Sequence, residues 1–207
     1  MADRARRPRL DPTDRQDPPG VLAAGMGNVL MRDDGLGPHV VRRLAAEWEA
    51  PEGVALRDLG TPGADLISHL RGTAALVVVD TVRADGPPGT LHRYDRDALT
   101  SAPTGPRVGP HDPGLTETLS TLSLLDEAPA EVVLLGVVPG TVRSGTGLTP
   151  AVARAVPRAM EAVRRELDRL GVPLRRRSEP RAPDLWWERR PAGERPGANG
   201  PSPAARG

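Results

Sequence analysis

The chain has 207 residues and a formal net charge of +1, and all 28 of its basic side chains are arginines. A balance this close to neutral does not suit a nucleic-acid-binding protein, and we expect no nucleic-acid partner. Cysteine is absent, which excludes disulfides, thiolate metal ligands and cysteine nucleophiles. No apolar run approaches the roughly 18 residues of a membrane span, and no apolar stretch follows the N-terminal arginines as in a signal peptide. We therefore expect a cytoplasmic protein without a membrane span.

Three segments differ in composition. Residues 1–19 and 174–207 are polar and rich in proline and arginine, with little to bury. Such segments cannot offset the entropy that is lost on ordering, so both are predicted to be disordered. Residues 20–173 are long enough for one domain with a real core. The tryptophan pair at 186–187 could dock onto the domain or a partner, but a disordered tail is the favoured interpretation, and deletion of residues 178–207 is expected to leave activity intact.

Apolar residues within 20–173 alternate between a strand period and a helix period. In chain order, the sequence predicts a strand over 21–25, a helix over 38–48, a strand over 54–59, a helix over 63–70, strands over 75–80 and 90–95, a helix over 113–122, a strand over 131–138 and a helix over 152–170. The run at 75–80 is apolar throughout, as in a central strand buried on both faces, whereas 90–95 alternates as an edge strand does. Gly171 is expected to end the last helix. The alternation predicts an α/β fold with a mostly parallel sheet.

The first candidate site is the glycine-rich turn GMGNVLMRDDGLG at 25–37, which follows a predicted strand and precedes a helix. A dinucleotide-binding turn of the GxGxxG type would need a third glycine where Leu30 stands. Asp33 and Asp34 would also repel a pyrophosphate, so this ligand class is disfavoured. Acidic residues before a helix also serve as helix caps, and that alternative stays open here.

Asp80 is the second candidate, because it ends the apolar run 75–80. In an open α/β sheet, ligands bind beyond the carboxyl ends of the strands. A carboxylate that only caps nearby backbone is the alternative. Asp80 and Thr81 could also belong to the DTG motif of an aspartic protease, but Val82 replaces the glycine and no second copy exists.

His111 is the third candidate, in a Pro–His–Asp–Pro loop before a predicted helix. A surface histidine without a role is the alternative. The other histidines are weaker candidates, because His39 and His69 fall in predicted helices and His92 falls in the predicted edge strand.

The fourth candidate is DLGTPG at 58–63, where a strand runs into a glycine turn. Gly60 and Gly63 indicate positive φ angles or a close approach of backbone. An ordinary turn is the alternative interpretation. As a loop at the same edge of the sheet, the segment could line a groove.

Asp34, Asp80 and His111 each lie at a predicted loop beyond a strand. Two carboxylates and one imidazole suit a borderline divalent metal with coordination positions left for a substrate. Sequence spacing alone leaves open whether the three side chains meet.

Five motifs occur in an order that resembles one known family. They are GMGNVLMRDDGLG at 25–37, DLGTPG at 58–63, the strand ending in Asp80 with Pro–Gly–Thr at 88–90, PHDPGL at 110–115 and GVVPGTVRSGTGLTPAV at 136–152. Together they resemble the nickel–iron hydrogenase maturation endopeptidases over essentially all of residues 20–173. One such motif alone would be a weak signal, whereas five in order are specific.

The resemblance implies a three-layer α/β sandwich, with helices on both faces of a twisted sheet. It also implies three nickel ligands, which carried over by motif are Asp34, Asp80 and His111. The family removes a C-terminal extension from the precursor of the hydrogenase large subunit after nickel insertion, and nickel supplied by that precursor serves as the recognition element. The implied partner is thus a nickel–iron hydrogenase large-subunit precursor, and the implied cofactor is nickel.

The resemblance also implies peptide hydrolysis. The chain has no cysteine and no GxSxG serine motif, so we expect attack by water. Asp34, Asp80 and His111 are the expected catalytic residues as well as the expected metal ligands. The residues expected to bind the substrate are Asp58, Gly60, Thr61 and Gly63.

Two interpretations from other functional classes remain open. One is a non-catalytic assembly chaperone that checks the metal in the large subunit without cutting the chain. The other is a Rossmann-like nucleotide-binding protein, against which the missing third glycine argues.

Overall fold

The computed structural model describes residues 19–100, 107–108 and 113–189, so the disorder predicted for residues 1–19 stays a prediction. Its centre is a sheet in the order β3-β1-β4-β7-β5. The strands are β1 (Val21–Met26), β3 (Val54–Gly60), β4 (Ala75–Arg83), β5 (Leu91–Asp95) and β7 (Glu131–Val137). The first four strands of this order run parallel, and β5 closes one edge antiparallel to β7, as predicted for an edge strand. A short strand, β6 (Arg107–Val108), pairs antiparallel with the end of β4.

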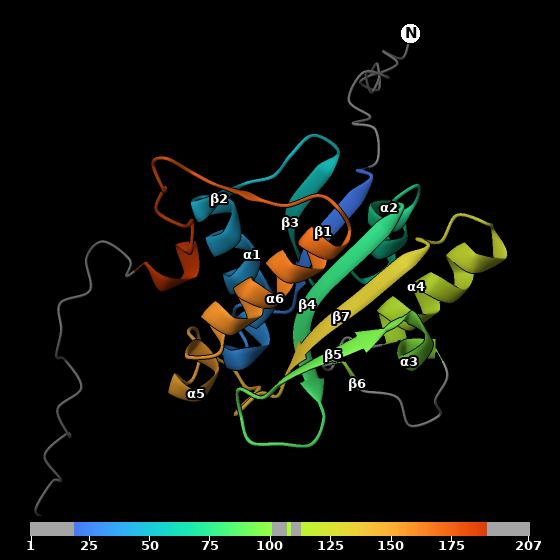
Figure 1. Cartoon of the computed structure of the whole chain (residues 1–207). Helices are drawn as coiled ribbons and strands as arrows, with labels where there is room; N and C mark the ends of the chain where they lie inside the picture. The colour runs from blue at the N-terminus through green and yellow to red at the C-terminus, as the bar shows by residue number, and fades with distance from the viewer. Residues whose placement is uncertain (1–18, 101–106, 109–112, 190–207) are drawn as a thin grey trace, which may run out of the picture.

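Helices cover both faces of this sheet (Figure 1). On one face lie α1 (Leu36–Glu47) and α6 (Val156–Arg169), and on the other lie α2 (Leu66–Leu70) and α4 (Pro113–Leu124). The remaining short elements are η2 (Arg32–Gly35), β2 (Trp48–Glu49), η3 (Gly63–Asp65), α3 (Arg96–Thr100), α5 (Pro150–Ala153), β8 (Arg175–Arg176) and η4 (Trp186–Glu188). The predicted α/β sandwich is confirmed. In the described part of the chain no helix is long and apolar enough to cross a membrane, and the cytoplasmic location stays a prediction.

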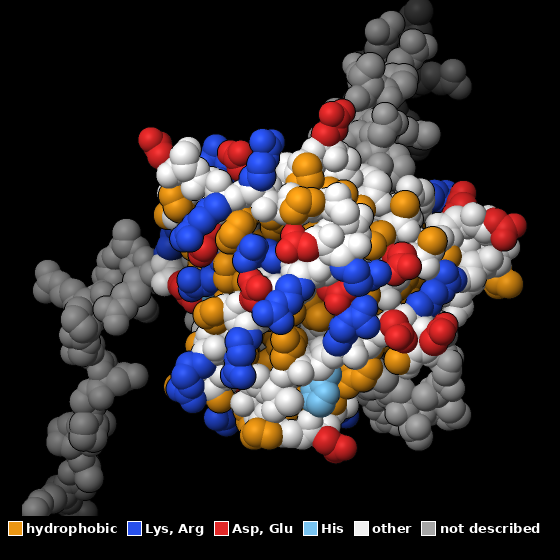
Figure 2. All heavy atoms as spheres, viewed as in Figure 1, with side chains coloured by type: hydrophobic (Ala, Val, Ile, Leu, Met, Phe, Trp, Pro, Cys, Tyr) orange, Lys and Arg blue, Asp and Glu red, His pale blue; other side chains and the backbone are white. Residues whose placement is uncertain are grey.

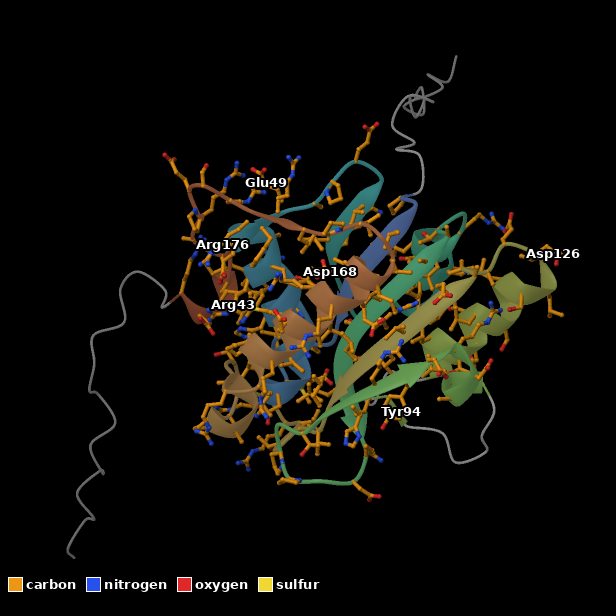
Figure 3. The ribbon with its side chains drawn as sticks, in the orientation of Figure 1. Arg43, Glu49, Tyr94, Asp126, Asp168 and Arg176 are labelled. Atoms are coloured by element: carbon orange, nitrogen blue, oxygen red, sulfur yellow. The ribbon has the colours of Figure 1, made fainter. Side chains whose placement is uncertain are left out.

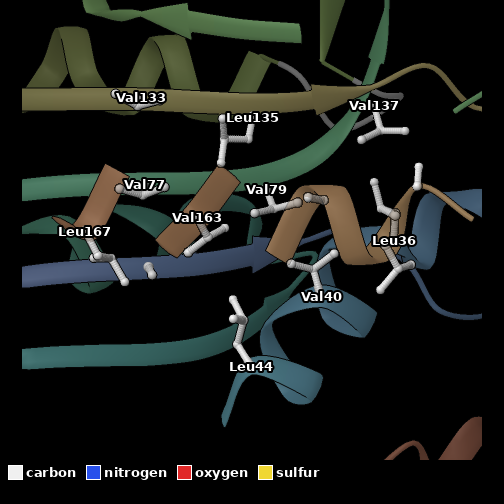
Figure 4. Packing of buried hydrophobic residues seen from close by; sticks show 14 of the residues in the cluster. Leu36, Val40, Leu44, Val77, Val79, Val133, Leu135, Val137, Val163 and Leu167 are labelled. Atoms are coloured by element: carbon white, nitrogen blue, oxygen red, sulfur yellow. The ribbon is translucent and has the colours of Figure 1, made fainter. Parts of the chain in front are cut away.

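The central strand β4 explains why both faces need helices. Val77 and Val79 belong to the core cluster under α1 and α6, which Figure 4 shows from close by. Leu76 and Val78 belong to the cluster under α2 and α4. All four side chains are at most 1% exposed. Because successive strand residues point to opposite faces, an unbroken apolar run requires a cover on each side.

One predicted strand is longer than expected. The strand predicted over 75–80 continues in β4 as far as Arg83, where it gains the short pair with β6. Asp80 therefore lies within β4 and not at its end. Gly25 of β1 pairs with Val79, so Asp80 is still level with the carboxyl end of β1.

The helix predicted over 152–170 is two helices, α5 and α6. Pro157 has no N–H to donate to the carbonyl of Ala153, as a continuous helix would require, and the break falls at this point. Gly171 ends α6 as predicted. It has a φ of 78°, and its N–H donates to the carbonyl of Asp168 at 3.0 Å.

Residues 174–189 pack against the domain, which corrects the disorder predicted for this part of 174–207. Three large apolar side chains hold the segment, since Leu174, Leu185 and Trp187 are each at most 7% exposed. Composition does not predict this packing, because the average polarity of residues 174–207 conceals the few apolar side chains among them. A few apolar residues that each fill a site on the domain suffice to order it.

Acidic and basic side chains mix on the face formed by α6 (Figure 2). Glu166 on this helix accepts hydrogen bonds from Arg93 at 2.6 Å and from Arg169 at 2.9 Å. The bond from Arg93 is the main cause that lowers the pKa of Glu166. Arg93 and Arg169 are therefore paired with an acidic side chain of the domain.

Candidate functional site

Two glycines bring the acidic turn η2 onto the edge of the sheet. Gly37 lies in the first turn of α1, where an added Cβ would overlap the carbonyl oxygens of Met26 and Val79. Gly27 has a φ of 125°, and a Cβ there would overlap the carbonyl oxygen of Asp34. Only glycine permits contacts this close, so the glycines of the first motif fix the position of the acidic turn.

Asp34 and Asp80 are both buried at this edge, with exposed fractions of 0% and 3%. Thr81 joins them. Its hydroxyl donates to Oδ1 of Asp34 at 3.2 Å, and its backbone N–H donates to Oδ1 of Asp80 at 2.7 Å. The backbone N–H of Asn28 donates to Oδ2 of Asp34 at 2.9 Å. Two buried carboxylates joined through one threonine form an oxygen-donor pair that suits a divalent cation.

Asp33 has a different, structural role. Its buried carboxylate accepts hydrogen bonds from the backbone N–H groups of Gly140, Thr141 and Thr149 at 2.8, 3.0 and 2.6 Å, and from the hydroxyl of Thr149 at 2.9 Å. These bonds tie the acidic turn to the loop between β7 and α5. No side chain caps α1, so the alternative that Asp33 and Asp34 are caps of this helix is wrong.

His111 lies outside the described residues, so its role stays a prediction. Among the residues that the structure describes, no group of three histidine, aspartate or glutamate side chains could hold a metal ion. A third ligand for Asp34 and Asp80 would therefore come from another part of the chain or from a substrate. The other three histidines lie on the predicted helices and edge strand.

The DLGTPG turn lies beside the acidic turn, since the N–H of Gly27 donates to the carbonyl of Gly60 at 2.8 Å. Gly60 and Gly63 have φ angles of 55° and 53°, as predicted. Asp58 organises the turn: its Oδ1 accepts the N–H of Gly60 at 3.0 Å and its Oδ2 accepts Nε of Arg42 at 2.6 Å. Arg42 thereby attaches the turn to α1.

A groove of about 410 Å³ lies between these two turns. It is lined by residues 27–30, residues 58–61, Pro38 and Arg42 of α1, and the C-terminal pair 186–187, and we call it the tryptophan groove. Three of the four residues predicted to bind the substrate line it, and Gly63 does not. Their substrate role stays a prediction.

Three residues of this region were not singled out from the sequence. Thr149 carried a signal, because a threonine before the proline that starts a helix is typical of an N-cap, but here its hydroxyl binds Asp33. Thr81 has no signal of its own in the sequence beyond its place next to Asp80. No sequence pattern pointed to Arg42, whose partners are set by the tertiary fold.

Comparison with known proteins identifies the family. The family model described as hydrogenase maturation protease matches residues 38–166. The chain belongs to the hydrogenase maturation protease family. The hydrogenase 2 maturation protease of Escherichia coli strain K12 is 32% identical over 153 residues, which covers 73% of this chain and 93% of that protein. The hydrogenase expression/formation protein HupD of Thiocapsa roseopersicina is 32% identical over 162 residues, covering 78% and 73% of the two chains.

Solved structures agree. The hydrogenase maturating endopeptidase HybD from Escherichia coli matches this protease with a TM-score of 0.71 at 31% identity, covering 76% of this chain and 98% of that one. A nickel–iron hydrogenase maturation protease HybD from Thermococcus kodakarensis matches with a TM-score of 0.59 at 27% identity, covering 70% and 97%. The resemblance drawn from the motifs is thus confirmed, and the protein is an endopeptidase. Residues 174–189 of this hydrogenase maturation protease lie beyond the family model, which ends at residue 166.

Proposed function

We propose that this protease removes the C-terminal extension of a nickel–iron hydrogenase large-subunit precursor after nickel insertion, and that it uses the nickel in the precursor as its recognition element. Family membership supports an endopeptidase that acts in hydrogenase maturation. The observation that carries the nickel part is the buried pair Asp34 and Asp80, joined through Thr81.

Asp34, Asp80 and His111 are the residues that would hold the metal. Two carboxylates and an imidazole are donors that a borderline divalent ion accepts. When bound, nickel supplies a positive charge that attracts the carboxylates and polarises a nearby carbonyl. Such a set leaves positions for ligands of the precursor, so binding would depend on whether the precursor is loaded.

Cleavage needs a water nucleophile, because the chain has no cysteine and no GxSxG motif. We assign the general base to the Asp34–Asp80 pair. One carboxylate takes a proton from the attacking water while the oxygen of that water bonds to the carbonyl carbon of the scissile peptide. The carboxylate then gives this proton to the leaving amine as the C–N bond breaks. Thr81 and the backbone N–H of Asn28 keep the carboxylates in position.

A cleavage assay with nickel-loaded and nickel-free precursor tests this proposal, with the mass of the large subunit as the readout. We expect only the loaded precursor to be shortened. Treating the free protease with a chelator should change little, because the nickel arrives with the precursor. Equal cleavage of both forms would overturn the role of nickel. Binding of the loaded form without cleavage would overturn the proposed removal of the C-terminal extension.

A further inference from the structure

The C-terminal segment 174–189 runs back along α1, from the C-terminal end of that helix toward its N-terminal end (Figure 1). β8 pairs antiparallel with β2 just beyond the end of α1 (Figure 3). Further along, the N–H of Arg181 donates to the carbonyl of Ala46 at 2.9 Å, and Trp187 reaches His39. The segment therefore ends beside the edge of the sheet that carries the candidate site.

Trp187 anchors the end of this segment. It is 6% exposed, its Nε1–H donates to Nε2 of His39 at 3.0 Å, and the two rings meet edge to face with centroids 5.2 Å apart. The guanidinium of Arg42 lies 5.3 Å from the centroid of Trp187. Arg42 also donates to the carbonyl oxygen and carboxylate of Asp184 at 2.9 and 3.1 Å, and to Asp58 at 2.6 Å. One arginine thus fastens both the DLGTPG turn and the C-terminal segment to α1.

Trp186, in contrast, is 51% exposed and packs edge to face on Trp187 with centroids 5.6 Å apart. Leu30, which also lines the tryptophan groove, is likewise 51% exposed. Among the described residues the exposed large apolar side chains are Leu30, Leu124, Leu125 and Trp186, and two of these four line one groove. Exposed apolar side chains gathered at a groove mark a contact site.

We propose that Trp186 and Trp187 form one wall of the substrate groove, and that Trp186 is a specificity-determining residue that packs against an apolar side chain of the precursor near the scissile bond. This inference rests on the proposed function. The tryptophan groove adjoins the candidate site, because Asn28 lines the groove and its N–H donates to Asp34.

The walls of the groove suit a peptide. Gly60 leaves backbone uncovered at the groove, because a Cβ there would meet nothing within 4 Å, so a chain can approach it closely. Leu30 and the indole of Trp186 supply apolar surface for a side chain. The sequence alone predicts that deletion of residues 178–207 leaves cleavage intact. Because Trp186 and Trp187 line the groove, we expect this deletion to weaken binding of the precursor instead.

The test compares cleavage of nickel-loaded precursor by the full-length protease and by its Trp186→Ala variant. We expect KM to rise about tenfold while kcat stays within about twofold, because the lost contact serves binding and not the chemical step. Trp186→Phe retains apolar surface and should keep most of the affinity. Leu124→Ala is the matched control, since Leu124 is 86% exposed on α4 and does not line the groove.

An unchanged KM in Trp186→Ala would overturn the inference, and so would an equal rise in the Leu124→Ala control. If the wild-type protease does not cleave loaded precursor, the proposed function fails. The inference is then tested by the affinity of the same precursor for the wild type and for Trp186→Ala. Equal affinities, or no binding to either protein, would overturn it.

Discussion

The carboxylate of Asp33 accepts both the backbone N–H and the hydroxyl of Thr149, at 2.6 and 2.9 Å. It also accepts two backbone N–H groups from the loop after β7. The next residue, Asp34, instead binds the hydroxyl of Thr81 and the N–H of Asn28. Two adjacent aspartates therefore serve different purposes: Asp33 holds the turn to the domain, and Asp34 belongs to the candidate site.

Substitutions at Asp33 and Asp34 are expected to differ in their effects on stability and on cleavage. Asp33→Asn should lower the free energy of unfolding by about 3 kcal/mol, because an amide cannot accept hydrogen bonds at both ends and leaves buried N–H groups unpaired. Asp34→Asn should cost about 1 kcal/mol and abolish cleavage of the precursor. Urea unfolding of both variants, alongside the cleavage assay, checks the contrast. An Asp33→Asn variant as stable as the wild type would contradict the structural role.

Asp80→Asn and His111→Ala are each expected to stop processing, because we propose that both residues hold the metal; both variants should still fold. Circular dichroism and the cleavage assay together measure this. Asp126→Asn is the matched acidic control: Asp126 is exposed after α4 and has a φ of 56°, which asparagine tolerates. His92→Ala is the histidine control, on the edge strand β5. Retained cleavage by Asp80→Asn would remove Asp80 from the site.

Gly37→Ala should destabilise the protein strongly, by at least about 3 kcal/mol, because the new Cβ would overlap two carbonyl oxygens of the sheet. The backbone of β1 and β4 cannot move away without losing ladder hydrogen bonds. Gly114→Ala is the control, since a Cβ at this position of α4 meets nothing within 4 Å. That change should raise the thermal midpoint slightly. Equal stability of the two variants would contradict the close approach of α1 to the sheet.

Local chemistry explains what the sequence predicted well. The apolar run of β4, the alternation of β5 and the end of α6 at Gly171 depend on neighbours in the chain, and each was found as predicted. Gly60 and Gly63 were predicted to have positive φ for the same reason. Such features follow from periods and turn chemistry within a few residues.

Long-range pairing explains what the sequence could not predict. Asp33 and Thr149 are 116 residues apart, so nothing beside Asp33 distinguished its role from that of Asp34. His39 and Trp187 are 148 residues apart, and the composition around Trp187 indicated a disordered tail. The family resemblance supplied Asp34, Asp80 and His111 as a set, whereas the docked C-terminal segment lies beyond the family model and needed the structure.

The contact between His39 and Trp187 predicts how stability depends on pH. Burial, and then the positive charge of Arg43, lower the pKa of His39 to about 4. The Nε1–H of Trp187 also requires an unprotonated Nε2 as its acceptor, while Glu188, 3.6 Å away, would favour the charged ring. The unfolded chain takes up this proton near pH 6.5, before the folded chain does, so the contribution is fully present above about pH 6.5 and is lost as the pH falls toward about 4.

His39→Gln tests this, because a glutamine can accept the Trp187 hydrogen bond without titrating. The difference in urea midpoint between wild type and His39→Gln should change as the pH is lowered from about 7 to about 4.5, with the wild type losing more stability. The same change at His69 on α2 is the control and should leave the pH dependence of the wild type in place. A His39→Gln protein that follows the wild-type pH curve would show that the histidine keeps the same protonation in the folded and unfolded chains. In that case mild acid would not weaken the contact between Trp187 and His39. The affinity of the protease for the precursor should then not fall in mild acid either.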